Sequence, residues 1–137
     1  MENNNSNMEN NDEDDKKKVM IVDDEPDIIS ILEIVLEENG FKVDSFEDPI
    51  VALKNYRAGV YDLLILDIKM PQMDGFELYD EIKKRDDKVK VCFLTASEMY
   101  YKQSRKEKYY SLDKDLFIQK PIENEELVRE INKILNS

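Results

Sequence analysis

Five residues with charged or hydroxyl side chains stand where apolar runs of the sequence end. The run "KKVMIVDD" ends in Asp23 and Asp24, "DLLILD" ends in Asp67, "KVCFLTA" has Thr95 next to its end, and "LFIQK" ends in Lys120. Carboxylates bind hard divalent cations such as Mg²⁺, and a carboxylate can act as a nucleophile toward phosphorus. A metal ion and a lysine ammonium can neutralise the oxygens of a phosphoryl group during its transfer. These residue types are therefore sufficient to accept a phosphoryl group.

The residues that the sequence lacks exclude several other chemistries. The chain has no histidine, so it contains neither a histidine general base nor a phosphohistidine. Its single cysteine, Cys92, excludes an intramolecular disulfide and a cysteine-based zinc site. No residue of the set is placed to activate water quickly, so a phosphoryl group on Asp67 is expected to persist for some time.

Charge and hydropathy indicate the surroundings in which the chain works. The 137 residues carry a net charge of −12, and an acidic chain is poorly suited to binding the phosphate backbone of nucleic acids. No apolar run approaches the length that spans a membrane, and the acidic start lacks the form of a signal peptide. The sequence therefore predicts a cytoplasmic protein with neither a nucleic-acid nor a membrane partner.

The beginning of the chain differs in composition from the remainder. Residues 1–15 contain six acids and no base, and they are rich in asparagine. A low-complexity segment of this kind cannot bury enough apolar surface to become ordered. We predict a disordered acidic tail over residues 1–16 and a single domain over residues 17–137.

Strand-like and helix-like patterns alternate along the predicted domain. Strands are predicted at residues 17–24, 41–46, 62–67, 90–96 and 116–120, and helices at residues 25–39, 48–57, 74–86, about 98–110 and 123–135. The runs at 62–67 and 90–96 are apolar on both faces, which is typical of parallel strands covered on both sides. Five strands that alternate with five helices predict an α/β fold with a doubly wound parallel sheet.

Helical periodicity also predicts which side chains face the core. The side chains predicted to lie inward are Ile28, Ile31, Leu32 and Val35 in the first helix, Phe76, Tyr79 and Ile82 in the third helix, and Cys92 in the fourth strand. Asp48 and Pro49 are predicted as the N-cap and the first residue of the second helix.

This fold class would bring the carboxylates together. In open parallel sheets, binding sites lie beyond the carboxyl ends of the strands. Neighbouring strands lie about 4.8 Å apart, so Asp23, Asp24 and Asp67 meet if the first and third strands are adjacent. Three carboxylates at one place repel one another unless a cation holds them. A divalent metal site is therefore predicted at this edge of the sheet.

Four short motifs together resemble the receiver domain of two-component response regulators. They are "VDDE" after the first strand, "LDIKMPQMDG" after the third, "TA" after the fourth and "KP" after the fifth. The resemblance covers about residues 17 to 136, with the motifs in the order of the family. It implies a flavodoxin-like receiver fold with strand order 2-1-3-4-5 and a phosphorylation site at Asp67.

The resemblance also implies a role for each residue near the phosphorylation site. It implies Mg²⁺ bound by Asp24, by Asp67 and by the backbone carbonyl of Lys69. Asp23 would bind the same ion chiefly through water. Thr95 would contact the phosphoryl group and move inward on activation.

Further implied roles fall near the last strand. Lys120 would pair with a phosphoryl oxygen, and the peptide bond between Lys120 and Pro121 is cis in the family. Phe117 falls where the family has a rotating aromatic switch, which phosphorylation would bias inward. The stretch "SLDKD" replaces the small pair that is usual before the last strand, and the segment from Thr95 to Lys120 is longer than usual. The family therefore does not define the geometry of residues 98–115.

The resemblance implies two protein partners. The donor in the family is a phosphohistidine on a sensor histidine kinase or a phosphotransfer protein, and it must be another molecule because this chain has no histidine. A downstream target would bind the face formed by the helix at about 98–110, the strand at 116–120 and the helix at 123–135. We interpret the chain as a stand-alone receiver of the chemotaxis-regulator kind. It would be a phospho-acceptor, with only self-phosphorylation and slow self-dephosphorylation of its own.

Three other functions make different demands on the sequence. A Mg²⁺-dependent phosphatase of the haloacid dehalogenase type would carry a second aspartate two residues after the nucleophile, where this chain has Lys69. A flavodoxin-like cofactor carrier would need a phosphate-binding loop after the first strand, where "DDEPD" would repel a phosphate. A degenerate receiver that serves only as a docking module would not need the complete acidic cluster.

Overall fold

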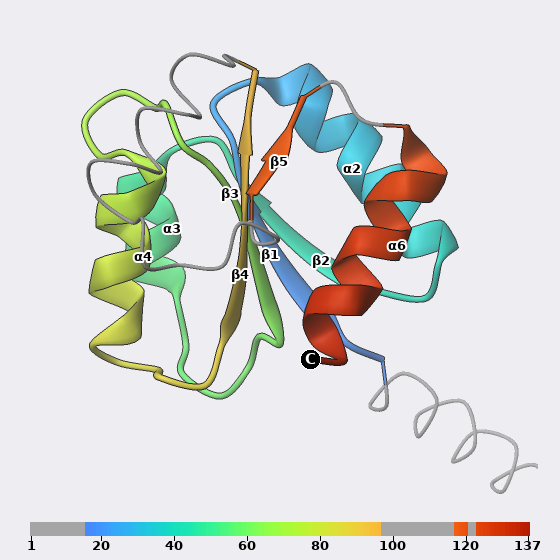
Figure 1. Ribbon diagram of the computed structural model, residues 1–137. Helices are drawn as coiled ribbons and strands as arrows, with labels where there is room; N and C mark the ends of the chain where they lie inside the picture. The colour runs from blue at the N-terminus through green and yellow to red at the C-terminus, as the bar shows by residue number, and fades with distance from the viewer. Residues whose placement is uncertain (1–15, 97–116, 121–122) are drawn as a thin grey trace, which may run out of the picture.

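Five strands and four helices make up the part of the chain that the structure, a computed structural model, describes: residues 16–96, 117–120 and 123–137 (Figure 1). In chain order they are β1 (Lys18–Val22), α2 (Pro26–Glu38), β2 (Lys42–Phe46), α3 (Pro49–Asn55), β3 (Leu63–Asp67), α4 (Gly75–Lys83), β4 (Lys90–Thr95), β5 (Phe117–Gln119) and α6 (Asn124–Leu135). The helix expected at about 98–110 and the tail expected over 1–16, except Lys16, lie outside the described residues.

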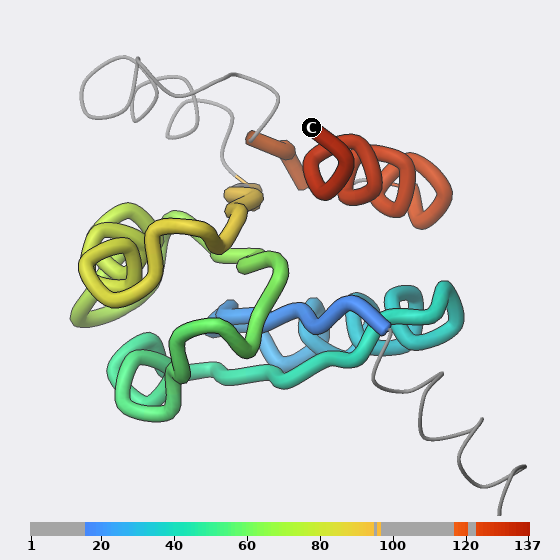
Figure 2. The backbone as a smooth tube through the Cα atoms, turned by 90° about the horizontal axis from the view of Figure 1, so that it is seen from below, coloured from blue at the N-terminus to red at the C-terminus, as the bar shows by residue number. Residues whose placement is uncertain are grey.

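The strands form one parallel sheet in the order β2-β1-β3-β4-β5. The helices lie in two layers, with α2 and α6 on one face of the sheet and α3 and α4 on the other (Figures 1 and 2). The predicted doubly wound α/β fold and its strand order are therefore confirmed. Because β1 is adjacent to β3, the carboxyl ends of these two strands lie side by side.

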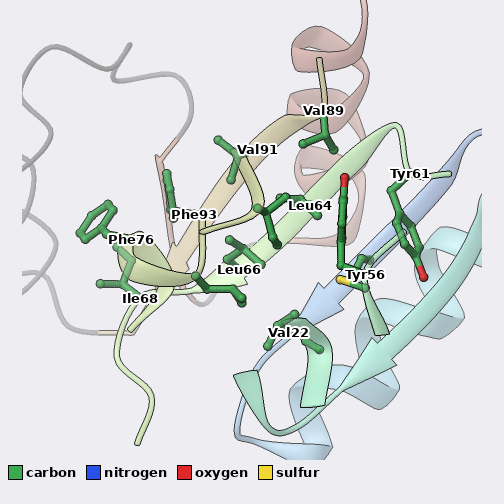
Figure 3. Close-up of a cluster of buried hydrophobic side chains, with 14 of the residues drawn as sticks. Val22, Tyr56, Tyr61, Leu64, Leu66, Ile68, Phe76, Val89, Val91 and Phe93 are labelled. Carbon is green, nitrogen blue, oxygen red and sulfur yellow. The ribbon is translucent and has the colours of Figure 1, made fainter. Parts of the chain in front are cut away.

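Alternate side chains of the strands enter two separate cores. In β3, Leu64 and Leu66 belong to the cluster on the α3 and α4 side, which also contains Phe93 (Figure 3). Leu63 and Ile65 belong to the cluster on the α2 and α6 side. Burial of each aliphatic side chain stabilises the fold by about 1.5–3 kcal/mol. Packing from both faces thus fixes β3, whose last residue is Asp67.

Side-chain caps determine where two of the helices begin. Asp74 accepts a hydrogen bond from the backbone N–H of Glu77 (2.8 Å), and the carboxylate of Glu77 accepts one from the N–H of Asp74 (3.1 Å). This capping box begins α4 directly after the loop that follows β3. Asp48 caps α3 by accepting from the N–H of Ile50 (2.8 Å), and Pro49 is the first helical residue, as predicted.

The inner face of α2 differs from the predicted one. Ile31 was expected to face inward, but 51% of its surface is exposed, whereas Ile29 and Leu36 are buried together with Leu32 and Val35. The helix carries apolar side chains around most of its circumference, so periodicity alone could not identify the buried side. In the other layer, Phe76 and Ile82 are buried as predicted, Tyr79 is half-buried against Phe93, and Cys92 is buried in the α2 and α6 cluster.

Helix α3 ends two residues before the predicted end at residue 57. Tyr56 leaves the helix in an extended conformation, and its ring is buried among the side chains of Figure 3. Its hydroxyl donates a hydrogen bond to the carboxylate of Asp86 (2.6 Å). This tertiary contact outweighs the helical tendency of the local sequence.

Candidate functional site

Three separate strand ends bring Asp23, Asp67 and Lys120 together. Asp23 follows β1, Asp67 is the last residue of β3, and Lys120 follows β5. The ammonium of Lys120 lies 2.6 Å from Oδ2 of Asp23 and 3.7 Å from Oδ1 of Asp67. The predicted meeting of these side chains beyond the carboxyl ends of the strands is therefore present in the structure.

An open pocket of about 570 Å³ gives access to the buried Asp67. Only 5% of Asp67 is exposed. The residues that line the pocket are Asp24, Glu25, Asp67, Lys69, Met70, Pro71 and Ala96. A small phosphate compound entering this pocket would therefore meet the carboxylate of Asp67.

Four carboxylates at this place fit a divalent metal ion. One oxygen each of Asp23, Asp24, Glu25 and Asp67 lies within 4.8 Å of the others. Oxygen ligands of this kind suit hard cations such as Mg²⁺. The sequence predicted three of these acids. Glu25 was not counted, although its place directly after the two aspartates was a signal that could have included it.

The acidic cluster makes Asp67 hard to ionise. The pKa of Asp67 is raised to about 7. Burial is the largest cause, and the neighbouring charge of Asp23 raises the pKa by more than the charge of Lys120 lowers it. Burial also raises the pKa of Asp23, despite its hydrogen bond to Lys120. For Lys120, burial lowers the pKa, but the hydrogen bond to Asp23 and the charge of Asp67 outweigh it and raise the pKa above its ordinary value. A bound cation would relieve this repulsion, so the residues present fit a metal ion.

This raised pKa predicts how stability depends on pH. The folded protein holds the proton of Asp67 more tightly than the unfolded chain, so the contribution of Asp67 to the free energy of unfolding should fall as the pH rises from 3.8 to about 7. Asp67→Asn removes the ionisation. Without metal, the variant should exceed wild type in stability at pH 8 by on the order of 3 kcal/mol, and by little at pH 4. Urea unfolding in a chelator at both pH values measures the difference.

A surface acid provides the control for this prediction. Asp87→Asn removes an exposed carboxylate on the loop before β4, and its stability should follow the wild-type pH dependence. Parallel curves for Asp67→Asn and wild type between pH 4 and 8 would contradict the expected repulsion in the cluster.

The loop after β3 approaches Asp67 closely. The N–H of Gly75 donates to the carbonyl of Ile68 (2.9 Å), which ties the start of α4 to the end of β3. A Cβ atom at Gly75 would overlap the backbone carbonyl of Asp67 and lie 3.2 Å from Cα of Ile68. In the same loop, Gln72 has a φ of 73°, and the N–H of Met73 donates to the carbonyl of Pro71 (2.8 Å). This is a strained γ-turn at the rim of the pocket.

The remaining predicted site residues lie near the same edge of the sheet. The backbone of Thr95 ends β4 in register with Gln119, and Lys69 is exposed and lines the pocket. Phe117 is buried, with its ring stacked on that of Phe93 at 5.3 Å between centroids. The side chain of Thr95 and the predicted cis peptide before Pro121 lie outside the described part of the chain.

Comparison with known proteins shows the family to which this site belongs. The model of the response regulator receiver domain family matches residues 19–132. The chain is a member of this family. It is thus a two-component response regulator receiver domain, and the matched range includes each of the strand ends described above.

Solved structures support the same assignment. The response regulator TrrA of Thermotoga maritima, in complex with Mg²⁺ and BeF, is 35% identical, with a TM-score of 0.73 over 86% of this chain and 98% of TrrA. TrrA in complex with the histidine kinase ThkA is also similar, with 35% identity and a TM-score of 0.70 over 87% of this chain and 98% of TrrA. The receiver fold is therefore shared over nearly the whole of TrrA.

Curated relatives are longer than this receiver domain. The transcriptional regulatory protein TctD of Salmonella typhimurium is 33% identical over 113 residues, which are 82% of this chain and 49% of TctD. The chain spans about half the length of TctD and of the response regulator SaeR of Staphylococcus aureus. Because such a relative is named a transcriptional regulator, the stand-alone form and the absence of a nucleic-acid partner stay predictions.

Within residues 16–96, 117–120 and 123–137, no helix has both the length and the apolar character that crossing a membrane requires.

Proposed function

We propose that the protein is a phosphorylation-switched receiver that accepts a phosphoryl group on Asp67, with Mg²⁺, from a phosphohistidine of a sensor histidine kinase or phosphotransfer protein. One observation carries the proposal. The buried carboxylate of Asp67 opens onto the pocket while other carboxylates and the ammonium of Lys120 surround it. This arrangement supplies a nucleophile, metal ligands and a cation within one site.

The residues of the site would divide the chemistry among them. An oxygen of Asp67 attacks phosphorus, the bond from phosphorus to the donor imidazole breaks, and the bonding electrons leave with the imidazole nitrogen. Asp24, Asp67 and the carbonyl of Lys69 would hold Mg²⁺, with Asp23 acting chiefly through water. The ion supplies positive charge against the phosphoryl oxygens. Lys120 donates to one of these oxygens, and Thr95 hydrogen-bonds to another.

The output of the switch is a change at a protein surface. In the proposed cycle, phosphorylation draws Thr95 inward, favours the inward position of Phe117 and reshapes the face that includes β5 and α6. A downstream target binds this face together with the helix predicted at about 98–110. The TrrA–ThkA complex supports a kinase as the partner on the donor side. The phosphoryl group is then lost slowly, because the set of Asp23, Asp24, Asp67, Thr95 and Lys120 includes no group placed to activate water quickly.

Intact-protein mass spectrometry tests the proposal. Wild type incubated with acetyl phosphate and Mg²⁺ should gain a single phosphoryl group, and it should gain none without Mg²⁺. Asp67→Asn should gain none under either condition, whereas the control Asp87→Asn should behave as wild type. Failure of wild type to form an adduct, with no response to beryllofluoride either, would indicate a docking module. Continuous release of phosphate at enzyme-like turnover would indicate a phosphatase.

A further inference from the structure

The start of α2 contains a glutamate whose carboxylate does not cap the helix. Glu25 is the N-cap residue of α2, yet its carboxylate makes no capping hydrogen bond. Ser, Thr, Asp and Asn are the residues that cap helices well. The N–H of Glu25 instead donates to Oδ1 of Asp23 (2.9 Å). The helix start therefore does not explain why a glutamate stands here.

The carboxylate of Glu25 contacts Lys120 instead. Oε1 of Glu25 lies 3.4 Å from Nζ of Lys120, whereas the nearest oxygen of Asp67 lies 3.7 Å from the same ammonium. Glu25 lines the acidic pocket, and it also lines a neighbouring cavity of about 290 Å³ to which Lys120 contributes. In this structure the lysine is thus directed at least as much toward Glu25 as toward the carboxylate that would receive the phosphoryl group.

We propose that Glu25 is a positioning residue that restrains Lys120 and thereby slows phosphoryl transfer to Asp67. This inference rests on the proposed function. To donate to a phosphoryl oxygen on Asp67, the ammonium must redirect hydrogen bonds that it makes to Asp23 and Glu25. The ammonium is nearly buried, with 9% of the side chain exposed, so few waters can replace a lost partner.

The size of the effect follows from exposure. The side chain of Glu25 is 56% exposed, so water and salt screen its contact with the ammonium. Contacts of this kind are weak, and their removal should change a rate by about three- to fivefold. Glu25 also adds a negative charge to the acidic cluster, so its removal should weaken Mg²⁺ binding. Saturating Mg²⁺ therefore separates the restraint from the metal affinity.

Three variants distinguish the effect of the contact between Glu25 and Lys120 from the effect of the negative charge of Glu25. Glu25→Gln removes the charge, and Glu25→Asp keeps the charge but is too short to maintain the contact. Asp27→Asn removes an exposed charge from the first turn of the same helix. At saturating Mg²⁺, both Glu25 variants should be phosphorylated by acetyl phosphate about three- to fivefold faster than wild type. Asp27→Asn should match wild type.

Several results would overturn the proposal. If Glu25→Asp keeps the wild-type rate while Glu25→Gln is faster, charge alone acts and Glu25 does not position Lys120. If both Glu25 variants keep the wild-type rate, or if Asp27→Asn accelerates as much as they do, the restraint does not exist.

The ¹⁵N resonance of the Lys120 ammonium provides a readout that does not depend on phosphorylation. In the metal-free protein, Glu25→Gln and Glu25→Asp should shift this resonance, and Asp27→Asn should leave it in place. An unchanged resonance in the Glu25 variants would show that Glu25 does not contact the Lys120 ammonium, and the proposal would be wrong. If the resonance moves as expected but wild type accepts no phosphoryl group, the proposed function is wrong. Glu25 then contacts Lys120 but cannot slow a transfer that does not occur.

Discussion

Replacement of Gly75 by alanine should destabilise the receiver by about 3 kcal/mol, because the new methyl group would overlap main-chain atoms that cannot move aside. The Cβ would overlap the carbonyl of Asp67 and lie 3.2 Å from Cα of Ile68. The first atom belongs to the last residue of β3, which is packed from both faces of the sheet, and the second belongs to the residue directly after it. Urea unfolding of Gly75→Ala at pH 7 with Mg²⁺ measures the loss.

A second glycine separates the overlap from backbone strain. Gly59 has a φ of 83°, and a Cβ there would meet nothing within 4 Å. Gly59→Ala should therefore cost only the strain of a left-handed backbone, about 1 kcal/mol. The variant Gly75→Ala should also accept a phosphoryl group more slowly, since α4 must move relative to Asp67. Equal stability losses in the two variants would contradict the close approach at Gly75.

Replacement of Lys120 by methionine should slow phosphorylation of Asp67 by about 100-fold, because a cationic donor to the phosphoryl oxygens is lost. The ammonium is nearly buried between Asp23 and Asp67, where a methionine side chain of similar length can be accommodated. Since Lys120 lowers the pKa of Asp67, its removal should also leave a smaller fraction of Asp67 ionised. A time course of adduct formation with acetyl phosphate measures the combined loss.

An exposed lysine with the same charge serves as the control. Lys133→Met changes the net charge equally at the end of α6, and its phosphorylation rate should remain that of wild type. A loss of less than threefold for Lys120→Met, with an intact fold by urea unfolding, would show that the ammonium does not assist the transfer.

The sequence predicted the parts of the site that depend on topology. Asp23 follows the strongly apolar β1 and Asp67 ends the strongly apolar β3, and the strand order that the family resemblance implied brings the ends of β1 and β3 together. The predicted fold class and strand order were therefore confirmed. The start of α3 at Pro49 was also predicted, because Asp48 satisfies backbone donors through a local hydrogen bond.

Features that depend on tertiary contacts could not be predicted. The ammonium of Lys120 lies closer to Asp23 than to the other carboxylates. This preference depends on the side-chain conformations of residues from three different strands and not on any local sequence pattern. The end of α3 depends on a hydrogen bond between Tyr56 and Asp86, which are 30 residues apart. The exposure of Ile31 depends on how α2 is rotated about its axis. Because α2 has apolar residues around most of its circumference, the sequence does not show which of them face the sheet.

The inward ring of Phe117 determines how the proposed switch is populated. It stacks on Phe93, lies 6.0 Å from the ring of Phe76, and is 6% exposed. Turning this ring outward would give up burial and stacking worth about 2–3 kcal/mol, so an outward state would occupy only about a few per cent of molecules or fewer. A target that recognises the inward ring would therefore find that ring in nearly every molecule, phosphorylated or not. Phe117 alone could then contribute little to the difference in target affinity between the two phosphorylation states. The difference in target affinity between the two phosphorylation states would then have to arise from other parts of the surface.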